Sequence, residues 1–180
     1  MAARPAGRTG GTRGSGAADP RARAYHRGVP QLPAPRIASF ADLDARTFHD
    51  LLRLRIDVFV VEQACPYPEL DGRDVEPGTR HLWLDDGGAP LAYLRILADP
   101  GGVARIGRVV VAPKARGGGH AGRLMAAALE LVGDRPCVLE AQSHLVDLYA
   151  RHGFAVAGPE YVEDGIPHTP MRREGIDQSR

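Results

Sequence analysis

Cysteine is scarce in this chain of 180 residues. Only Cys65 and Cys137 occur, 72 positions apart and without a CxxC pair. A disulfide framework or a cysteine-based zinc site needs more cysteines at closer spacing, and the seven histidines form no HxH or HxxxH pair that would bind a metal. The sequence therefore predicts no disulfide and no metal, and its cysteine usage is typical of a protein of the reducing cytoplasm.

Long apolar runs are also missing. The longest ones, such as residues 58–61 and 125–129, are far shorter than the roughly 20 apolar residues that a membrane-spanning helix needs. We therefore expect no membrane-spanning segment and no membrane partner. The composition, 43% hydrophobic and 25% charged, is typical of one globular domain.

A net positive charge is lacking from most of the chain, although the formal net charge of the whole is +1. Residues 1–36 contain seven arginines and one acid and so carry +6, which leaves −5 for residues 37–180. A nucleic-acid-binding domain needs a basic face that neutralises phosphates. We therefore expect no nucleic-acid partner for the domain, whose acidity favours a small cationic partner such as an amine.

The first 36 residues are rich in Gly, Pro, Ala and Arg and contain few large apolar residues. Such a segment cannot bury enough apolar surface to fold. It also lacks the apolar stretch of a secretory signal, and its Gly and Pro residues interrupt the amphipathic helix of a transit peptide. The sequence therefore predicts a disordered tail over residues 1–36 and a single domain over residues 37–180.

The domain alternates strand-like and helix-like patterns. Strands are expected at residues 36–40, 81–84, 91–97, 104–111, 137–141, 154–156 and 170–173, and helices at about 44–60, 119–132 and 145–152. The turns DDGGAP and DPGG between the second, third and fourth strands are too short to hold helices, so these strands form an antiparallel meander. The fold class is α/β, with a mixed, mostly antiparallel central sheet, one helical crossover and flanking helices.

The most informative segment is RIGRVVVAPKARGGGHAGRLMAAALELV, residues 105–132. A strand is followed by a turn with glycines and then by an amphipathic helix, so unpaired backbone N–H groups at the positive end of the helix can bind a phosphate. Arg116 adds a charged donor. The glycines that let the main chain approach the phosphate oxygens are Gly117, Gly118, Gly119 and Gly122.

Two nucleotide-binding folds share parts of this pattern. No Lys and Ser or Thr follow the glycines, which excludes a Walker loop. Gly117, Gly119 and Gly122 do spell GxGxxG, and Glu140 stands where a dinucleotide-binding fold places its ribose-binding acid. Because the preceding antiparallel meander disagrees with that fold, a dinucleotide-binding protein remains only as an alternative.

A resemblance to a known family indicates which phosphate-containing ligand the glycine-rich turn binds. RGGGHA, residues 116–121, resembles the (Q/R)xxGx(G/A) signature of the GNAT family of CoA-dependent acyltransferases, and LYARHGF, residues 148–154, is similar to the LYxxxGF of that family. Residues 55–72, 141–154 and 163–173 resemble its ElaA group. The resemblance covers nearly all of residues 37–173, and it implies a single GNAT-like domain whose central strands splay apart.

The resemblance also implies an activity. A GNAT N-acetyltransferase transfers the acetyl group of acetyl-CoA, its co-substrate, to a primary amine by direct attack in a ternary complex, without a metal. The acceptor is a small-molecule or peptide amine whose identity the sequence does not give. A non-catalytic CoA-binding sensor is the other alternative, and both a monomer and a homodimer are compatible with the sequence.

The resemblance assigns cofactor-binding roles by position. The pantetheine arm of CoA pairs with the central strand as if it were an added strand, and the residues at that place are Val109, Val110 and Val111. The pyrophosphate contacts the amides of a loop that consists here of Arg116, Gly117, Gly118, Gly119, His120 and Ala121. Gln142 replaces the usual Asn of the family and can still offer an amide to the cofactor.

The predicted catalytic residues are an acid and a base. Tyr149 matches the family tyrosine that gives a proton to the departing thiolate, a role that a positioned phenol can fill; packing of its ring in the core is the structural alternative. The candidates for the base are His81, at the start of a central strand, and Glu163, with Asp164 and His168 in the same predicted loop at residues 163–168.

Other polar residues are assigned to the acceptor side or to solvent. Glu62 and Gln63 line the acceptor pocket if the ElaA pattern holds, and His168 is grouped with them. Residues 65–78, CPYPELDGRDVEPG, form a polar loop in which Asp71 and Asp74 are expected to face solvent. His120 is expected to be exposed and without a catalytic role. Cys65 could be a nucleophile only with a base such as His81 beside it, whereas small buried cysteines are more common.

Overall fold

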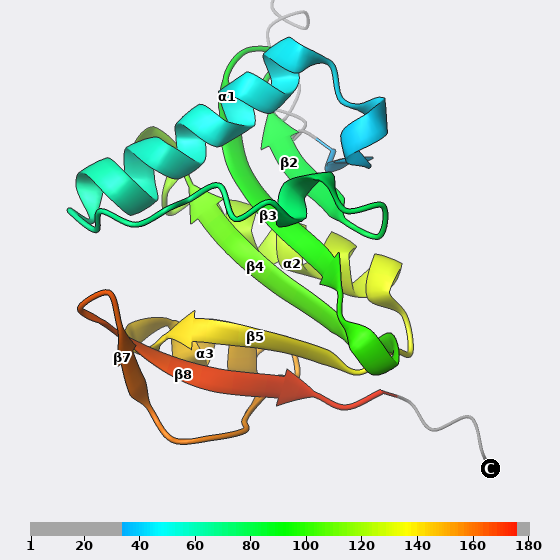
Figure 1. Ribbon diagram of the computed structural model, residues 1–180, viewed down its shortest axis with the longest axis vertical. Helices are drawn as coiled ribbons and strands as arrows, with labels where there is room; N and C mark the ends of the chain where they lie inside the picture. Colours follow the sequence, from blue (N-terminus) through cyan, green and yellow to red (C-terminus); the bar gives the residue numbers. More distant parts are fainter. Residues whose placement is uncertain (1–33, 176–180) are drawn as a thin grey trace, which may run out of the picture. The chain divides into compact units, whose positions relative to one another are not determined.

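The computed structural model describes residues 34–175, which form one sheet of eight strands with helices on both faces (Figure 1). The strands are β1 (Arg36–Ala38), β2 (Arg80–Asp85), β3 (Pro90–Ala98), β4 (Ala104–Val111), β5 (Cys137–Gln142), β6 (Ala155–Val156), β7 (Tyr161–Glu163) and β8 (Ile166–Arg173). Residues 1–33 of the predicted tail lie outside the described residues, whereas Arg36, which was included in that tail, begins β1.

Helices of three kinds connect these strands. The α-helices are α1 (Ala45–Arg55), α2 (His120–Val132) and α3 (Val146–Ala150), and η3 (Ile56–Glu62) is a π-helix. The short 3₁₀ turns are η2 (Phe40–Asp42), η4 (Arg73–Val75), η5 (Pro100–Gly102), η6 (Pro113–Ala115) and η7 (Ser143–Leu145). Within residues 34–175, none of these helices combines the length and the apolar composition that crossing a membrane requires.

The strand order is β1-β2-β3-β4-β5-β8-β6, and β7 pairs with β8. Every pair is antiparallel except β4 with β5, which α2 connects. The predicted mixed, mostly antiparallel sheet is therefore confirmed, together with its meander and its crossover. A dinucleotide-binding fold would instead place helices between successive parallel strands, so the topology argues against that alternative.

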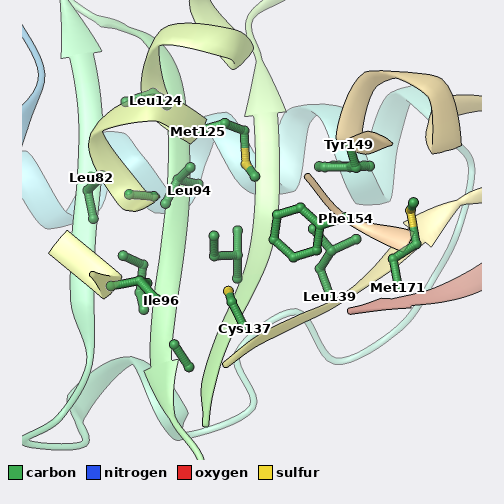
Figure 2. Close-up of a cluster of buried hydrophobic side chains, with 14 of the residues drawn as sticks. Leu82, Leu94, Ile96, Leu124, Met125, Cys137, Leu139, Tyr149, Phe154 and Met171 are labelled. Carbon is green, nitrogen blue, oxygen red and sulfur yellow. The ribbon is translucent and has the colours of Figure 1, made fainter. Parts of the chain in front are cut away.

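The two faces of the sheet are covered by different helices (Figure 1). On the face called here the α2 face, α2 and α3 pack against the strands and form the larger apolar cluster, part of which Figure 2 shows. The buried stripe of α2 consists of Leu124, Met125, Ala128 and Val132, at the spacings of three and four that predict an amphipathic helix. On the opposite face, the α1 face, a smaller apolar cluster lies under α1.

The first helix of the domain has two parts. The carboxylate of Asp44 accepts a hydrogen bond from the backbone N–H of Thr47 (2.9 Å) and caps α1, as the sequence predicts. After Arg55 the chain continues as the π-helix η3, which the 3.6-residue periodicity did not distinguish from α-helix. Segments with π-helical hydrogen bonds are rare and frequently lie at functional sites.

The central strands splay apart at β4 and β5. Their parallel register joins only Ala104 to Cys137 and Arg105 to Val138. Beyond this point the two strands diverge, as Figure 1 shows. The splayed centre that the family resemblance implies is therefore present, and it opens between the carboxyl half of β4 and the carboxyl end of β5.

The end of the chain differs from the prediction. Residues 163–168 are not a loop, because β7 and the start of β8 form a hairpin around Asp164 and Gly165. Both turn residues have positive φ, 50° and 79°, as the two central residues of a type I′ hairpin turn require. The dipeptide Asp-Gly is a standard signal for such a turn, and it was available in the sequence.

Candidate active site

A cavity of about 720 Å³ lies where β4 and β5 diverge. Its walls come from β4, the end of η3, the start of α2, β5, α3 and the β7–β8 hairpin. The predicted site residues that line it are Glu62, Gln63, Val109, Val110, Val111, Arg116, Ala121, Gln142, Tyr149, Glu163 and His168. Among the described residues, those predicted for the site but not in the cavity lining are His81, Gly117, Gly118, Gly119 and His120.

β4 presents an unpaired edge to this cavity. After Ala104 and Arg105, no described strand continues the ladder on the β5 side of β4. The same stretch contains a bulge, because the register with β3 shifts between Tyr93 and Arg95 and Arg108 has a φ of +54°. A ligand with amide groups in an extended arm can pair with such an edge as an added strand.

The glycine-rich turn reaches α2 through two left-handed residues, Gly117 (φ 79°) and Gly119 (φ 72°). Glycine is favoured at both positions because other L-residues rarely adopt this φ. Gly119 is the N-cap of α2, and a Cβ on either glycine would meet open space. The turn therefore leaves room beside the first N–H groups of α2, where the helix dipole stabilises an anion.

His120 occupies the inside of this turn, so its predicted exposure is wrong. The residue is buried, and a Cβ on Gly118 would lie 2.8 Å from its Nε2 atom. A side chain at residue 118 would therefore require the imidazole ring to move. The glycine-rich turn thus serves a packing purpose at Gly118 and leaves open space at Gly117 and Gly119.

Two side-chain contacts join the end of η3 to the other walls of the cavity. The carboxamides of Gln63 and Gln142 exchange two hydrogen bonds, with N–O distances of 3.4 and 3.2 Å. Nη2 of Arg116 donates to a carboxylate oxygen of Glu62 at 2.8 Å. The residues predicted for the acceptor pocket and those predicted for the cofactor are therefore direct neighbours.

Tyr149 lies at the boundary between the cavity and the core. The residue is 5% exposed, lines the cavity, and packs edge-to-face on Phe154 with 6.5 Å between ring centroids (Figure 2). Burial raises the pKa of Tyr149 to about 12, so its hydroxyl keeps its proton throughout the physiological range. The packing role is present in the structure, and the residue also lines the cavity to which the edge of β4 is presented.

His81 is placed as a structural residue. Its ring is fully buried, with Nδ1 at 2.7 Å from the hydroxyl of Tyr93 and Nε2 at 3.0 Å from the carbonyl oxygen of Asp74. Burial lowers the pKa of His81. Both ring nitrogens are used and the ring does not line the cavity, so this position gives no support to His81 as the base.

The β7–β8 hairpin brings the other base candidates to the cavity. Glu163, Asp164 and His168 all line it, and the ring of His168 stacks on Tyr161 at a centroid distance of 5.9 Å. Within residues 34–175, neither Glu163 nor Asp164 forms an ion pair. Their carboxylates are therefore free to attract an ammonium group.

A buried network of charges on the α1 face was missed by the sequence analysis. Asp74, expected to face solvent, is buried and accepts hydrogen bonds from Arg55 (2.8 Å) and Arg95 (2.9 Å). Asp71 accepts two hydrogen bonds from Arg95, at 2.9 and 2.6 Å. The prediction of a solvated acid is wrong for Asp74, because its partners lie far away in the sequence, whereas Asp71 is exposed as predicted although it pairs with Arg95. The available signal was Arg55, which occupies an apolar position of the α1 periodicity.

Cys65 is a buried thiol rather than an activated one. Its Sγ donates to the carbonyl oxygen of Asp164 at 3.6 Å. Burial, Asp164 and Glu163 all raise the pKa of Cys65, which disfavours the thiolate that nucleophilic catalysis requires.

Comparison with known families agrees with this geometry. Residues 49–174 match the family described as an acetyltransferase (GNAT) domain. The chain belongs to the GNAT family. A UPF0039 protein of Mycobacterium tuberculosis is 53% identical over 141 residues, which cover 76% of this chain and 90% of that protein. Protein ElaA of Escherichia coli is 40% identical over 144 residues, which cover 76% of this chain and 93% of ElaA.

Solved GNAT structures share the whole fold. An acyl-CoA N-acyltransferase from Pseudomonas aeruginosa is 43% identical, with a TM-score of 0.73, and the match covers 77% of this chain and 98% of that one. The structure of Escherichia coli ElaA is 36% identical, with a TM-score of 0.75, and the match covers 79% and 100% of the two chains. The predicted GNAT and ElaA resemblance is therefore confirmed, and the protein is an acyltransferase of this family.

Proposed function

We propose that the protein transfers the acetyl group of acetyl-CoA to a primary amine, by direct attack within a ternary complex. The observation that carries this proposal is the unpaired edge of β4, which faces the same cavity as the start of α2 and Tyr149. A strand edge, an anion-binding helix end and a phenol are the three features that the pantetheine, pyrophosphate and thiol parts of CoA need.

The described residues fit this co-substrate. The backbone of residues 109–111 would pair with the pantetheine amides, and Gln142 would add a side-chain amide near the end of β5. The open space at Gly117 and Gly119 would admit the pyrophosphate, with Arg116 as a charged donor. Acetyl-CoA supplies an acetyl group activated as a thioester.

Proton transfer would use the two opposite walls of the cavity. At neutral pH a primary amine is protonated, and it must lose a proton before its nitrogen can attack. Glu163 on the hairpin is the candidate base that accepts this proton. The nitrogen then bonds to the acetyl carbon while the carbon–sulfur bond breaks, and the further proton that the nitrogen loses on forming the amide passes to solvent. Tyr149 would donate its hydroxyl proton to the departing sulfur and recover a proton from solvent.

The acceptor side favours a cation over an anion. Glu163 and Asp164 carry charges that no described arginine balances, whereas the four arginines of this side, Arg73, Arg95, Arg105 and Arg108, are each paired with an acid. Glu62, Gln63 and His168 complete the candidate acceptor surface. A protonated amine would therefore be attracted to the hairpin.

Calorimetric titration with CoA tests the first half of this proposal. We expect saturable binding of CoA and none of NADH; binding of NADH alone would support the dinucleotide alternative. A thiol-release assay with acetyl-CoA and a panel of primary amines tests the second half. CoA binding without thiol release for any amine would identify a CoA-binding sensor instead.

A further inference from the structure

The bulge of β4 has an unusual residue at its centre. Arg108 has a φ of +54°, a region that glycine adopts freely and other L-residues avoid. Such a conformation persists only where the surroundings hold it. The bulge begins the unpaired stretch of β4, directly before residues 109–111, so whatever holds Arg108 also sets the edge that faces the cavity.

The guanidinium of Arg108 is held by two residues of the loop at 65–78. Nε of Arg108 lies 2.8 Å from Oε2 of Glu69, and the hydroxyl of Tyr67 donates to the same oxygen. Nη2 of Arg108 donates to the carbonyl oxygen of Glu69 at 3.4 Å. The guanidinium also lies over the Tyr67 ring, 5.6 Å from its centroid. These three side chains form what we call the brace.

The brace is anchored in the protein interior through Glu69. The Glu69 side chain is 3% exposed, and its Oε1 atom accepts a hydrogen bond from Nε of Arg55, whose side chain is fully buried. Arg55 in turn donates to Asp74, which also binds Arg95 of β3. Removing one partner of an ion pair buried in this way strongly destabilises the folded protein, because the other charge is left buried and unpaired. Glu69 is thus a fixed point from which Arg108 can be held.

We propose that Tyr67 and Glu69 are positioning residues that hold the β4 bulge through Arg108 and so fix the edge that receives CoA. This inference rests on the proposed function, because it names what orders the binding edge of that same site.

The test is a mutant cycle with two measurements. We would determine the CoA affinity by calorimetry and the amide hydrogen exchange of residues 107–111 in the ligand-free protein. Glu69→Gln should weaken CoA binding about tenfold, a change equivalent to about 1.4 kcal/mol, and accelerate exchange at the bulge. Tyr67→Phe, which leaves the pair of Glu69 with Arg55 in place, should have the same effects at smaller size. Tyr161→Phe is the matched control, because it removes a tyrosine-to-glutamate hydrogen bond that involves none of Tyr67, Glu69 and Arg108.

Arg108→Gly separates this inference from a general loss of structure. Because glycine adopts the positive φ without support, this variant should bind CoA within about threefold of the wild type. In its background Glu69→Gln should have no further effect on CoA affinity or on exchange. An equal tenfold loss in both backgrounds would overturn the inference, since Glu69 would then act through Arg55 and the loop.

The inference and the proposed function fail differently. If the wild type does not bind CoA, the proposed function is wrong, while hydrogen exchange in the ligand-free variants still decides whether the brace holds the bulge. If the wild type binds CoA but neither Tyr67→Phe nor Glu69→Gln changes affinity or exchange, the brace inference is wrong and the proposed function stands.

Discussion

The two faces of the sheet are both buried, but by different physical means. On the α2 face, side chains from α2, α3 and the strands form a continuous apolar cluster. On the α1 face, a smaller apolar cluster lies beside three arginines and three acids that pair with one another, namely Arg55, Arg95, Arg108, Glu69, Asp71 and Asp74. Apolar contacts are non-directional, whereas a buried charge must meet its partner at a defined place. The α2 face therefore stabilises the sheet by apolar packing, and the α1 face joins the loop at residues 65–78 to α1, β3 and β4 through ion pairs.

The largest effect on stability should come from breaking the charge network at its centre. Asp74→Ala leaves Arg55 and Arg95 without the carboxylate that they share. Removing one partner of a buried ion pair costs about 3–5 kcal/mol. Urea unfolding should show a loss of this size together with weaker CoA binding. A loss below about 1 kcal/mol would mean that water or rearrangement compensates the two guanidinium groups. The claim that charge pairing is what makes the α1 face differ from the α2 face would then be wrong.

A matching change on the α2 face should reduce stability without affecting the site. Leu124 is fully buried between α2 and the sheet. Leu124→Ala removes buried apolar surface and leaves a cavity, at a cost of about 2–5 kcal/mol, whereas Leu124→Met keeps the volume and should cost less than about 1.5 kcal/mol. CoA affinity measured well below the melting temperature should be unchanged in both variants. A fall in affinity would show that the two faces are coupled.

The same contrast explains which parts of the fold could be predicted from the sequence. The α2 face follows from a local pattern, because the residues of its buried stripe recur at spacings of three and four. The charges of the α1 face do not, because Glu69 and Asp74 find their partners 14 and 19 positions away. A loop rich in Pro, Gly and acids has the composition of a solvated segment, and nothing within it indicates burial.

The candidate site was likewise predictable only where its residues carry a local sequence signal. The glycine-rich turn and Tyr149 carry motifs, and the structure places Tyr149 in the cavity with the edge of β4. The bulge carries no local signal, because its positive φ falls on Arg108 and not on a glycine. His81 could not be assigned from sequence, since its burial depends on Tyr93 and on the carbonyl of Asp74. The hairpin at Asp164 and Gly165, in contrast, had a usable turn signal.

Tyr149 packs in the apolar cluster of the α2 face and also lines the cavity, so Tyr149→Phe separates its packing role from the proposed role as an acid. The ring and its contact with Phe154 are retained, and the melting temperature should stay within a few degrees of the wild type. If the hydroxyl protonates the departing thiolate, turnover should fall by roughly 10² or more, with little change in the KM for acetyl-CoA. Retention of more than about half of the turnover, under conditions where chemistry limits the rate, would assign the proton to water or to the substrate.

The glycine-rich turn offers a test that depends on charge rather than on packing. Gly119→Glu places a carboxylate where the pyrophosphate is proposed to lie, and Gly119→Ala is its control, because both variants carry the same strain at a φ of 72°. Open space at this position admits either side chain. The Glu variant should bind CoA more than about tenfold more weakly than the Ala variant, by the repulsion of like charges. A difference within about threefold, below 1 kcal/mol, would mean that no phosphate lies here.

The smallest expected effect is a difference in acid sensitivity between the faces. Burial alone would raise the pKa of Asp71, but hydrogen bonds from Arg95 and from the backbone of Arg73, with the charges of Arg95 and Arg108, hold this pKa well below its ordinary value. A carboxyl group with a lowered folded-state pKa adds stability above its unfolded-state pKa of about 3.9, and this contribution is lost as the pH falls through the folded-state pKa. Wild type and Asp71→Asn should therefore differ in melting temperature by about 2–4 °C at pH 6.

That difference should shrink as the pH falls from 4 towards 2, since Asp71 of the unfolded chain then binds a proton, whereas folded Asp71, with its lowered pKa, remains ionised. Leu124→Ala supplies the control from the α2 face. The titratable groups of that cluster, Cys137 and Tyr149, have pKa values raised by burial to about 11 and 12, so its gap to wild type should stay constant in acid. Differential scanning fluorimetry between pH 6 and pH 2 measures both gaps. If the Asp71→Asn gap also stays constant, Asp71 contributes by hydrogen-bond geometry and not by charge, and the physical contrast between the two faces is weaker than the buried network suggests.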